Sequence, residues 1–335
     1  MPDLSYSRAI VFGAGSWGTA LVALLAERGL EVQFWGRDAA LMEEIRSTRR
    51  NARYLPGLTL PESVRVTADM AELTPAELLV FVVPSKAVRE TAARAVAAGL
   101  GAREVVSCAK GIELGTGRRM TELLGEACPE SALAVLTGPN HAEEVSLKQA
   151  TAAVVACADG AVARQVQSVF TLPWFRTYTS DDVIGVEWAG AMKNPYAIAA
   201  GIALGLRLGD NAIAALVTRA LAEMVRLGVA MGGRAESFMG LGGVGDLMAT
   251  CYSEHSRNHR VGLQLGEGKP LQEILNSTRM VAEGVPNTAS LREAAQARGA
   301  RTPLLDEIYA ILYEGKPAHE AMRALLSRDP RPDTE

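Results

Sequence analysis

The chain has 335 residues, which is too long for one small core, so two domains are expected. Its net charge of −4 provides no overall basic field to recruit nucleic acid or an anionic membrane, so any anion must be bound by a local site. The 4 cysteines are scattered and form no C-x-x-C pair, which fits a reducing cytoplasm better than a disulfide framework.

A glycine-rich turn follows the first apolar run and opens a helical pattern that extends through Arg28. Gly13, Gly15 and Gly18 form G-x-G-x-x-G, in which the glycines permit a tight turn, close approach to a pyrophosphate, and close helix packing. This pattern predicts a dinucleotide site, and the alternative is an ordinary strand-to-helix turn that is rich in glycine. The motif begins so near Met1 that a signal peptide is not expected.

Residues 31–36 are predicted to form the second strand, whose end meets the adenosine ribose in a dinucleotide site. An acidic residue there binds the 2′-hydroxyl, whereas an arginine can bind a 2′-phosphate. The chain offers both, Arg37 and then Asp38. We favour Arg37, and hence tolerance of NADP(H), over a simple solvated turn. Residues 51–57 are predicted to be a turn-rich loop with little chemistry of its own.

Further apolar runs alternate with helical patterns as far as residue 180. Residues 78–83 have the continuous apolar character of a central parallel strand. The other predicted strands are 105–109, 132–137 and 151–157. This alternation predicts an open, doubly wound α/β sheet of the Rossmann type, forming a nucleotide-binding domain over residues 1–180.

Two polar residues follow predicted strands of this domain. Lys110 comes directly after one strand, and the carboxyl ends of such strands line the ligand crevice. The alternative for Lys110 is a surface lysine in a turn. His141 follows another strand, but a histidine in such a place is more often simply hydrogen-bonded, so no role is assigned to it.

Residues 181–335 have a different pattern, with long helical segments rich in Ala, Leu and Met, and are predicted to form an all-helical domain. Lys193 lies in an otherwise apolar segment of this domain, where an unpaired ammonium is costly. The Lys193 ammonium must therefore have a polar or charged partner, or its pKa must be lowered. Either condition suits a residue that transfers a proton. Snorkelling to solvent is the alternative, although Gly201 and Gly205 favour close packing.

Pro195 is expected to interrupt the backbone beside Lys193. It either breaks a continuing helix and frees the carbonyl of Ala191, or it begins a new helix that Asn194 caps.

Residues 238–250 contain a second glycine-rich loop, which ends at Asp246. Asp246 is predicted to be a helix N-cap and to pair with Lys193. Arg257, within a cluster of hydroxyl and amide side chains, provides the groups that a phosphate monoester needs. Cys251, His255 and His259 recur every fourth residue and would share one helix face, yet a zinc site needs a further ligand, so no metal site is predicted.

Seven segments, taken in order, resemble the bacterial NAD(P)-dependent glycerol-3-phosphate dehydrogenases across nearly the whole chain. They are Gly-Ala-Gly-Ser-Trp-Gly-Thr-Ala (13–20), Ala-Lys-Gly-Ile (109–112), Gly-Pro-Asn-His-Ala-Glu-Glu (138–144), Lys-Asn (193–194), Gly-x-Gly-Asp-Leu (243–247), Ser-Arg-Asn (256–258) and Val-x-Glu-Gly (281–284). The resemblance implies a C-terminal domain like that of 6-phosphogluconate dehydrogenase. It also implies reversible reduction of dihydroxyacetone phosphate to sn-glycerol 3-phosphate by NADPH or NADH, for glycerophospholipid synthesis.

The resemblance also implies roles for individual residues. Lys193 matches the family's proton-transferring lysine. The implied substrate contacts are Lys110, Gly138, Asn140, Lys193, Asp246, Ser256, Arg257 and Asn258. The implied cofactor contacts, with the three glycines of the turn, are Ser16, Trp17, Arg37, Tyr54, Lys110, Ala142, Arg257, Val281 and Glu283. Two positions depart from the family: Asn140 replaces a frequent serine, and Pro195 replaces an aliphatic residue.

Two other functions remain open at this stage. One is a related β-hydroxyacid or ketopantoate-type reductase, and the other is a non-catalytic NAD(P)-sensing module. A buried proton donor disfavours sensing. We expect a small-molecule substrate, a cytoplasmic location, no nucleic-acid partner and no stable membrane insertion, with a homodimer as the candidate assembly.

Overall fold

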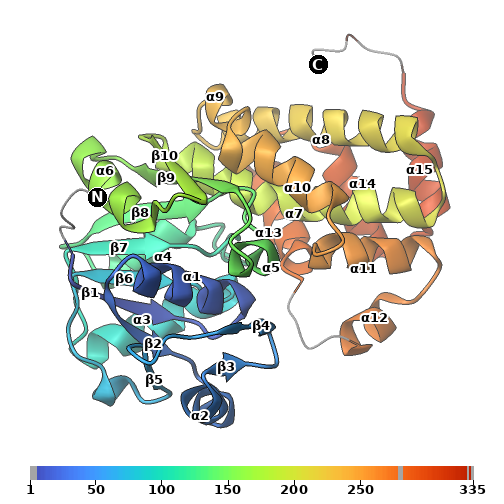
Figure 1. Ribbon diagram of the computed structural model, residues 1–335. Helices are drawn as coiled ribbons and strands as arrows, with labels where there is room; N and C mark the ends of the chain where they lie inside the picture. Colours follow the sequence, from blue (N-terminus) through green and yellow to red (C-terminus); the bar gives the residue numbers. More distant parts are fainter. Residues whose placement is uncertain (1–5, 278–281, 330–331, 333–335) are drawn as a thin grey trace. The chain divides into compact units, whose positions relative to one another are not determined.

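The computed structural model describes residues 6–277, 282–329 and 332, and the chain divides into two compact units (Figure 1). The first unit comprises Met1–Lys110 and Arg119–Val183. The second comprises Gly111–Arg118 and Ile184–Glu335. A short segment of the N-terminal half therefore belongs to the second unit, whereas the sequence pattern suggested one boundary at residue 180.

The first unit contains an 8-stranded sheet with the order β10-β9-β8-β7-β6-β1-β2-β5. Its strands are β1 (Arg8–Phe12), β2 (Glu31–Trp35), β5 (Arg65–Thr67), β6 (Leu78–Phe81), β7 (Glu104–Ser107), β8 (Ala132–Thr137), β9 (Thr151–Cys157) and β10 (Phe175–Ser180). Neighbouring strands are parallel, except that β8 and β9 are antiparallel. The predicted doubly wound sheet is confirmed, and β5 and β10 are additions at its two edges.

Both faces of this sheet are covered by helices, as the alternation along β1 shows. Ala9 and Val11 pack in one apolar cluster, and Ile10 and Phe12 pack in another. Since successive strand residues point to opposite faces, each face has its own core. The helices of this unit are α1 (Ser16–Glu27), α2 (Ala39–Thr48), α3 (Val88–Ala97), α4 (Met120–Ala127), α5 (Ala142–Ser146) and α6 (Gly160–Phe170), with short 3₁₀ turns at Met70–Glu72 and Ser85–Ala87.

A short hairpin of β3 (Arg50–Asn51) and β4 (Leu55–Thr59) occupies most of the stretch that was expected to be a loop. Asn51 is fully buried, and its amide nitrogen donates to the carbonyl of Ala14 (3.0 Å) and to Thr19 Oγ1 (2.8 Å). The hairpin is thereby attached to the glycine-rich turn.

The second unit is helical, as predicted, and α7 has α8 and α11 alongside it (Figure 1). Its elements are α7 (Val183–Gly205), α8 (Asp210–Ala230), α9 (Ala235–Phe238), a π-helical turn (Leu241–Gly245), α10 (Asp246–Tyr252), α11 (Arg257–Gly266), α12 (Leu271–Ser277), α13 (Gly284–Ala297), α14 (Pro303–Tyr313) and α15 (Ala318–Leu326). Ile112, from the returning segment Gly111–Arg118, is buried in the core of this unit. Within the described residues, no helix is both long and apolar enough to cross a membrane.

Helices α7 and α11 pack with their backbones in direct contact, because glycines face each other where they meet. A Cβ at Gly201 would collide with the carbonyl oxygen of His259, and one at Gly262 would collide with that of Ile198. A Cβ at Gly266 would lie 2.5 Å from the carbonyl oxygen of Ile202. This packing brings the start of α11 beside the middle of α7.

Pro195 does not interrupt the backbone, contrary to the sequence expectation, because α7 continues through it. A proline removes one backbone hydrogen bond, that to the carbonyl four residues earlier. Here that carbonyl belongs to Ala191 and accepts a hydrogen bond from the side-chain nitrogen of buried Asn287 on α13 (3.4 Å). The replacement partner allows the helix to continue, and Asn194 does not begin a new one.

A buried carboxylate links three helices of this unit. Glu223 on α8 is 1% exposed and accepts hydrogen bonds from Tyr196 Oη (3.0 Å) and from the backbone N–H groups of Leu304 (3.1 Å) and Leu305 (2.9 Å). Burial raises the pKa of Glu223 from 4.5 to about 7, although these hydrogen bonds oppose the shift.

Replacing Glu223 by glutamine should change how stability depends on pH. Because the folded-state pKa of Glu223 is raised, its contribution to stability is present below the unfolded pKa and is lost as pH rises through about 7. The wild type should therefore lose up to about 3 kcal/mol more than Glu223→Gln between about pH 5 and pH 8. Denaturant unfolding of both proteins across this range measures the difference. Parallel pH profiles would contradict the prediction.

Candidate active site and dinucleotide-binding turn

Lys193 is buried in the second unit, with 5% of its surface exposed, so it does not snorkel to solvent. Its Nζ donates to Asp246 Oδ1 (2.6 Å) and to Thr250 Oγ1 (2.6 Å). The Thr250 hydroxyl in turn donates to the backbone carbonyl of Asp246 (2.6 Å). Two side chains of α10 therefore fix the position of the ammonium on α7.

Asp246 pairs with Lys193 as expected, but the prediction that it is an N-cap is wrong. It is the first residue of α10 and has helical dihedral angles (φ −72°, ψ −30°). The preceding Gly245 is also helical, because the π-helical turn runs directly into α10. A capping side chain needs an extended residue before the helix, and this junction has none. The carboxylate is instead directed to the lysine.

The start of α11 holds the three polar residues that were expected to bind phosphate. Ser256 is the N-cap, and its Oγ accepts from the backbone N–H of His259 (3.2 Å). Asn258 is buried and connects three helices: its Nδ2 donates to Asn194 Oδ1 (2.9 Å), and its Oδ1 accepts from Gly284 N (2.9 Å). Arg257 is partly exposed.

The three residues considered as metal ligands do not share a helix face. Cys251 lies in α10, which ends at Tyr252, whereas His259 lies in α11 and His255 between them. Cys251 is fully buried, and burial raises the pKa of its thiol to about 12. In the described part of the chain, no group of three or more His, Cys, Asp or Glu side chains is placed to hold a metal.

In the first unit, the glycine-rich turn has the geometry that the motif predicts. Gly13 has φ +124°, and a Cβ there would lie 2.8 Å from the backbone of Val82. A Cβ at Gly18 would collide with the carbonyl oxygen of Gly13. Gly15 has nothing within 4 Å of where its Cβ would be, at the start of α1. Open space over this backbone and the helix N-terminus fits a dinucleotide pyrophosphate.

Lys110 is held against two other predicted substrate contacts. Its Nζ donates to the carbonyl of Gly138 (3.0 Å) and to Asn140 Oδ1 (3.0 Å). This fixes the orientation of the Asn140 amide. The Asn140 Nδ2 is buried and has no hydrogen-bond partner among the described residues. The asparagine that replaces the family's frequent serine therefore still presents a donor.

The remaining predicted cofactor contacts are distributed over both units. In the first unit, Ser16 and Ala142 are buried, Trp17 and Tyr54 are partly buried, and Arg37 is exposed. In the second unit, Glu283 directly precedes α13 and is partly buried. Val281 lies outside the described residues.

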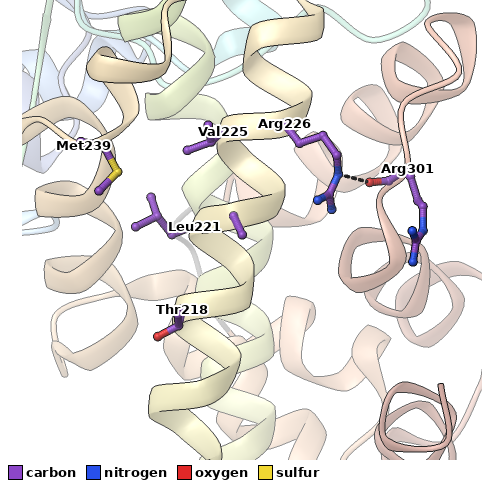
Figure 2. A pocket seen from close by; sticks show the side chains of 7 residues that line it. Thr218, Leu221, Val225, Arg226, Met239 and Arg301 are labelled. Carbon is purple, nitrogen blue, oxygen red and sulfur yellow. Dashed lines mark hydrogen bonds between the residues drawn. The ribbon is translucent and has the colours of Figure 1, made fainter. Parts of the chain in front are cut away.

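A separate surface pocket of about 570 Å³ lies along α8 (Figure 2). Arg226 donates to the backbone carbonyl of Arg301 there (3.1 Å). The other lining residues are Thr218, Leu221, Ala222, Val225 and Met239. Among the residues that the structure describes, this lining contains no carboxylate, imidazole or thiol and includes none of the predicted site residues.

The doubly wound sheet with its glycine turn, followed by a helical domain with a buried, ion-paired lysine, is typical of two-domain NAD(P)-dependent dehydrogenases. Family models described as the N-terminus and the C-terminus of NAD-dependent glycerol-3-phosphate dehydrogenase match residues 8–163 and 182–323. The chain belongs to this family.

Individual relatives are similar to this chain over almost its full length. A glycerol-3-phosphate dehydrogenase (NAD(P)+) of Moorella thermoacetica is 49% identical, with 95% of each chain covered. One from Streptomyces coelicolor is 45% identical, covering 97% of this chain and 98% of the relative. The crystal structure of glycerol-3-phosphate dehydrogenase from Coxiella burnetii is similar with a TM-score of 0.92 and 36% identity, covering 96% of this chain and 99% of that one.

Sequence reasoning missed Thr250 and the link between Asn194 and Asn258. Thr250 could have been found, since it lies four residues after Asp246 and so shares its helix face. The link joins residues 64 positions apart and has no local signal.

Proposed function

We propose that this protein reversibly reduces dihydroxyacetone phosphate to sn-glycerol 3-phosphate with NADPH or NADH. The observation that carries the proposal is the buried ammonium of Lys193, fixed by Asp246 and Thr250 within a family match that covers both units. When bound, the reduced nicotinamide supplies a hydride to the ketone carbon.

Lys193 supplies the positive charge and the proton for the ketone oxygen. As charge develops on that oxygen, the ammonium stabilises it and then donates the proton. Asp246 keeps the lysine oriented, and Thr250 also accepts a hydrogen bond from its ammonium.

The phosphate of the substrate does not react, so its binding energy can be used for positioning. Arg257 and Ser256 at the start of α11 supply a guanidinium and a hydroxyl for it. Asn258 contributes by connecting α11 to α7, in addition to its expected substrate contact. Lys110, Gly138 and Asn140 provide further polar groups, with the Asn140 Nδ2 as donor.

The cofactor contacts implied by the family are retained as part of the proposal. The turn of Gly13, Gly15 and Gly18 receives the pyrophosphate, and Arg37 is exposed where a 2′-phosphate would be bound. The remaining proposed contacts are Ser16, Trp17, Tyr54, Lys110, Ala142, Arg257, Val281 and Glu283.

The proposed role in the cell is supply of glycerol phosphate for phospholipids, in the cytoplasm. The four cysteines are free and buried, as suits a reducing compartment. The net charge of −4 supports the absence of a nucleic-acid partner. A homodimer is retained as the assembly to be tested by sedimentation.

An NAD(P)H-oxidation assay with the purified protein tests the reaction. Turnover with dihydroxyacetone phosphate, and none with ketopantoate or β-keto acids, would support the proposal. A preference for the keto acids would favour the alternative reductase. A ketopantoate reductase from Ralstonia eutropha is similar in fold, with a TM-score of 0.60 and 17% identity. Dinucleotide binding with no turnover on any substrate would indicate a sensing module.

Replacing Arg257 by alanine should weaken substrate binding more than it slows the chemical step. A charge-assisted hydrogen bond to phosphate contributes about 1.5–3 kcal/mol, so KM for dihydroxyacetone phosphate should rise about 10- to 100-fold. We expect kcat to change by less than about 5-fold. The control is Arg260→Ala, which removes an exposed arginine from the same helix. An unchanged KM in Arg257→Ala would argue against the phosphate role.

A further inference from the structure

The β3–β4 hairpin holds its tip beside the glycine-rich turn through Asn51. Besides the bonds of its amide nitrogen to Ala14 and Thr19, the side-chain oxygen of Asn51 accepts from the backbone N–H of Tyr54 (3.2 Å). The hairpin tip, with Arg53 and Tyr54, is therefore fixed relative to the dinucleotide turn.

Arg53 reaches from this tip to the end of β2. Its Nη1 lies 2.6 Å from Asp38 Oδ2. Its guanidinium also lies over the ring of Tyr54, 6.0 Å from the ring centre. Both members of the ion pair are partly exposed, and Arg37, next to Asp38, is exposed.

Both carboxylate oxygens of Asp38 are engaged within the first unit. Oδ1 accepts from the backbone N–H of Leu41 (3.1 Å) and so caps α2, while Oδ2 accepts from Arg53. These hydrogen bonds, that from Leu41 first, lower the pKa of Asp38 below its usual value. The direction of the carboxylate is therefore set by α2 and by Arg53.

The end of this strand is where NAD and NADP are distinguished. A carboxylate that accepts from the ribose 2′-hydroxyl favours NAD(H), whereas an arginine favours the 2′-phosphate of NADP(H). An unpaired carboxylate next to Arg37 would repel that phosphate. With Arg53 bound to it, both oxygens of the carboxylate already accept hydrogen bonds and its charge is offset.

We propose that Arg53 determines the dinucleotide preference of this protein by holding Asp38, so that NADP(H) binds more tightly than NAD(H). This inference rests on the proposed function, since it requires the glycine turn to bind a dinucleotide. Arg53 acts through Asp38, whose negative charge it offsets.

Calorimetric titration of the full-length protein with NADPH and NADH tests the inference without relying on turnover. In Arg53→Ala, the Kd for NADPH should rise about 10-fold, while that for NADH should stay within about 2-fold or decrease. Adding Asp38→Asn should restore most of the NADPH affinity, since asparagine still caps α2 but has no charge.

Arg50→Ala is the matched control, because it removes an exposed arginine of the same hairpin, one that contacts Thr59 Oγ1 (3.1 Å). The ratio of the Kd for NADPH to the Kd for NADH should be the same in Arg50→Ala as in the wild type. An unchanged ratio in Arg53→Ala, or equal weakening of both dinucleotides, would overturn the inference while leaving the proposed function intact. Failure of the wild type to bind either dinucleotide would overturn both.

Discussion

Replacing Lys193 by alanine should lower kcat for dihydroxyacetone phosphate reduction by about 10³- to 10⁴-fold. The variant lacks both the proton donor and the charge that stabilises the developing alkoxide. Dinucleotide affinity should be nearly unchanged, since Lys193 is not among the proposed cofactor contacts. Steady-state kinetics and calorimetric titration measure the two quantities. A normal kcat would eliminate Lys193 as the proton donor.

Loss of Lys193 also removes an ion-pair partner of the buried Asp246, which is expected to cost about 3–5 kcal/mol of stability. The double variant Lys193→Ala, Asp246→Asn also removes the negative charge of the Asp246 carboxylate. It should recover part of that stability while remaining inactive. Lys269→Ala, which removes an exposed lysine from the same unit, should behave as the wild type. Inactivity that persists when stability is recovered separates the chemical role from a folding defect.

Replacing Gly262 by alanine should destabilise the protein by about 3 kcal/mol or more. The added methyl group would collide with the carbonyl of Ile198, and a backbone atom in a helix cannot move aside as a flexible side chain can. Helix α11 would have to shift from α7, which would strain the bond between Asn258 and Asn194. Denaturant unfolding measures the loss of stability, and an increased KM for the phosphate substrate would report the shift of α11.

Gly240→Ala is the matched control within the second unit. Its added methyl group would meet Ser237 at 3.5 Å, an ordinary contact, and its φ of −90° suits any residue. Equal stability of the Gly240→Ala and Gly262→Ala variants would contradict the prediction, because it would show that Gly262 is not needed for the close packing of α7 and α11.

Features encoded by neighbouring residues could be predicted from the sequence. The glycine motif was recognisable because its three positions are fixed by one turn, and the central strands because their residues are continuously apolar. The pairing of Lys193 was predictable for a different reason. A charge in an apolar helix must have a partner, and Asp246 was the carboxylate in the next glycine-rich segment.

The features that could not be predicted depend on partners far along the chain. Helix α7 continues through Pro195 because Asn287 donates a hydrogen bond to the carbonyl of Ala191. Asn287 and Ala191 are 96 positions apart in the sequence. The capping role predicted for Asp246 was wrong because a π-helical turn precedes it. The glycines of that turn do not indicate a π-helical conformation in the sequence. The spacing of Cys251, His255 and His259 suggested one face, but α10 ends at Tyr252.

The returning segment Gly111–Arg118 has a consequence for dissecting the protein into fragments. A single cut at Val183 does not separate the two units, because a fragment that begins at Ile184 lacks Ile112, which is buried in the helical core. Such a fragment would contain a cavity the size of an isoleucine side chain, a defect of about 2–5 kcal/mol. A self-sufficient helical half would therefore need the eight-residue piece supplied as a peptide or joined to it through a linker.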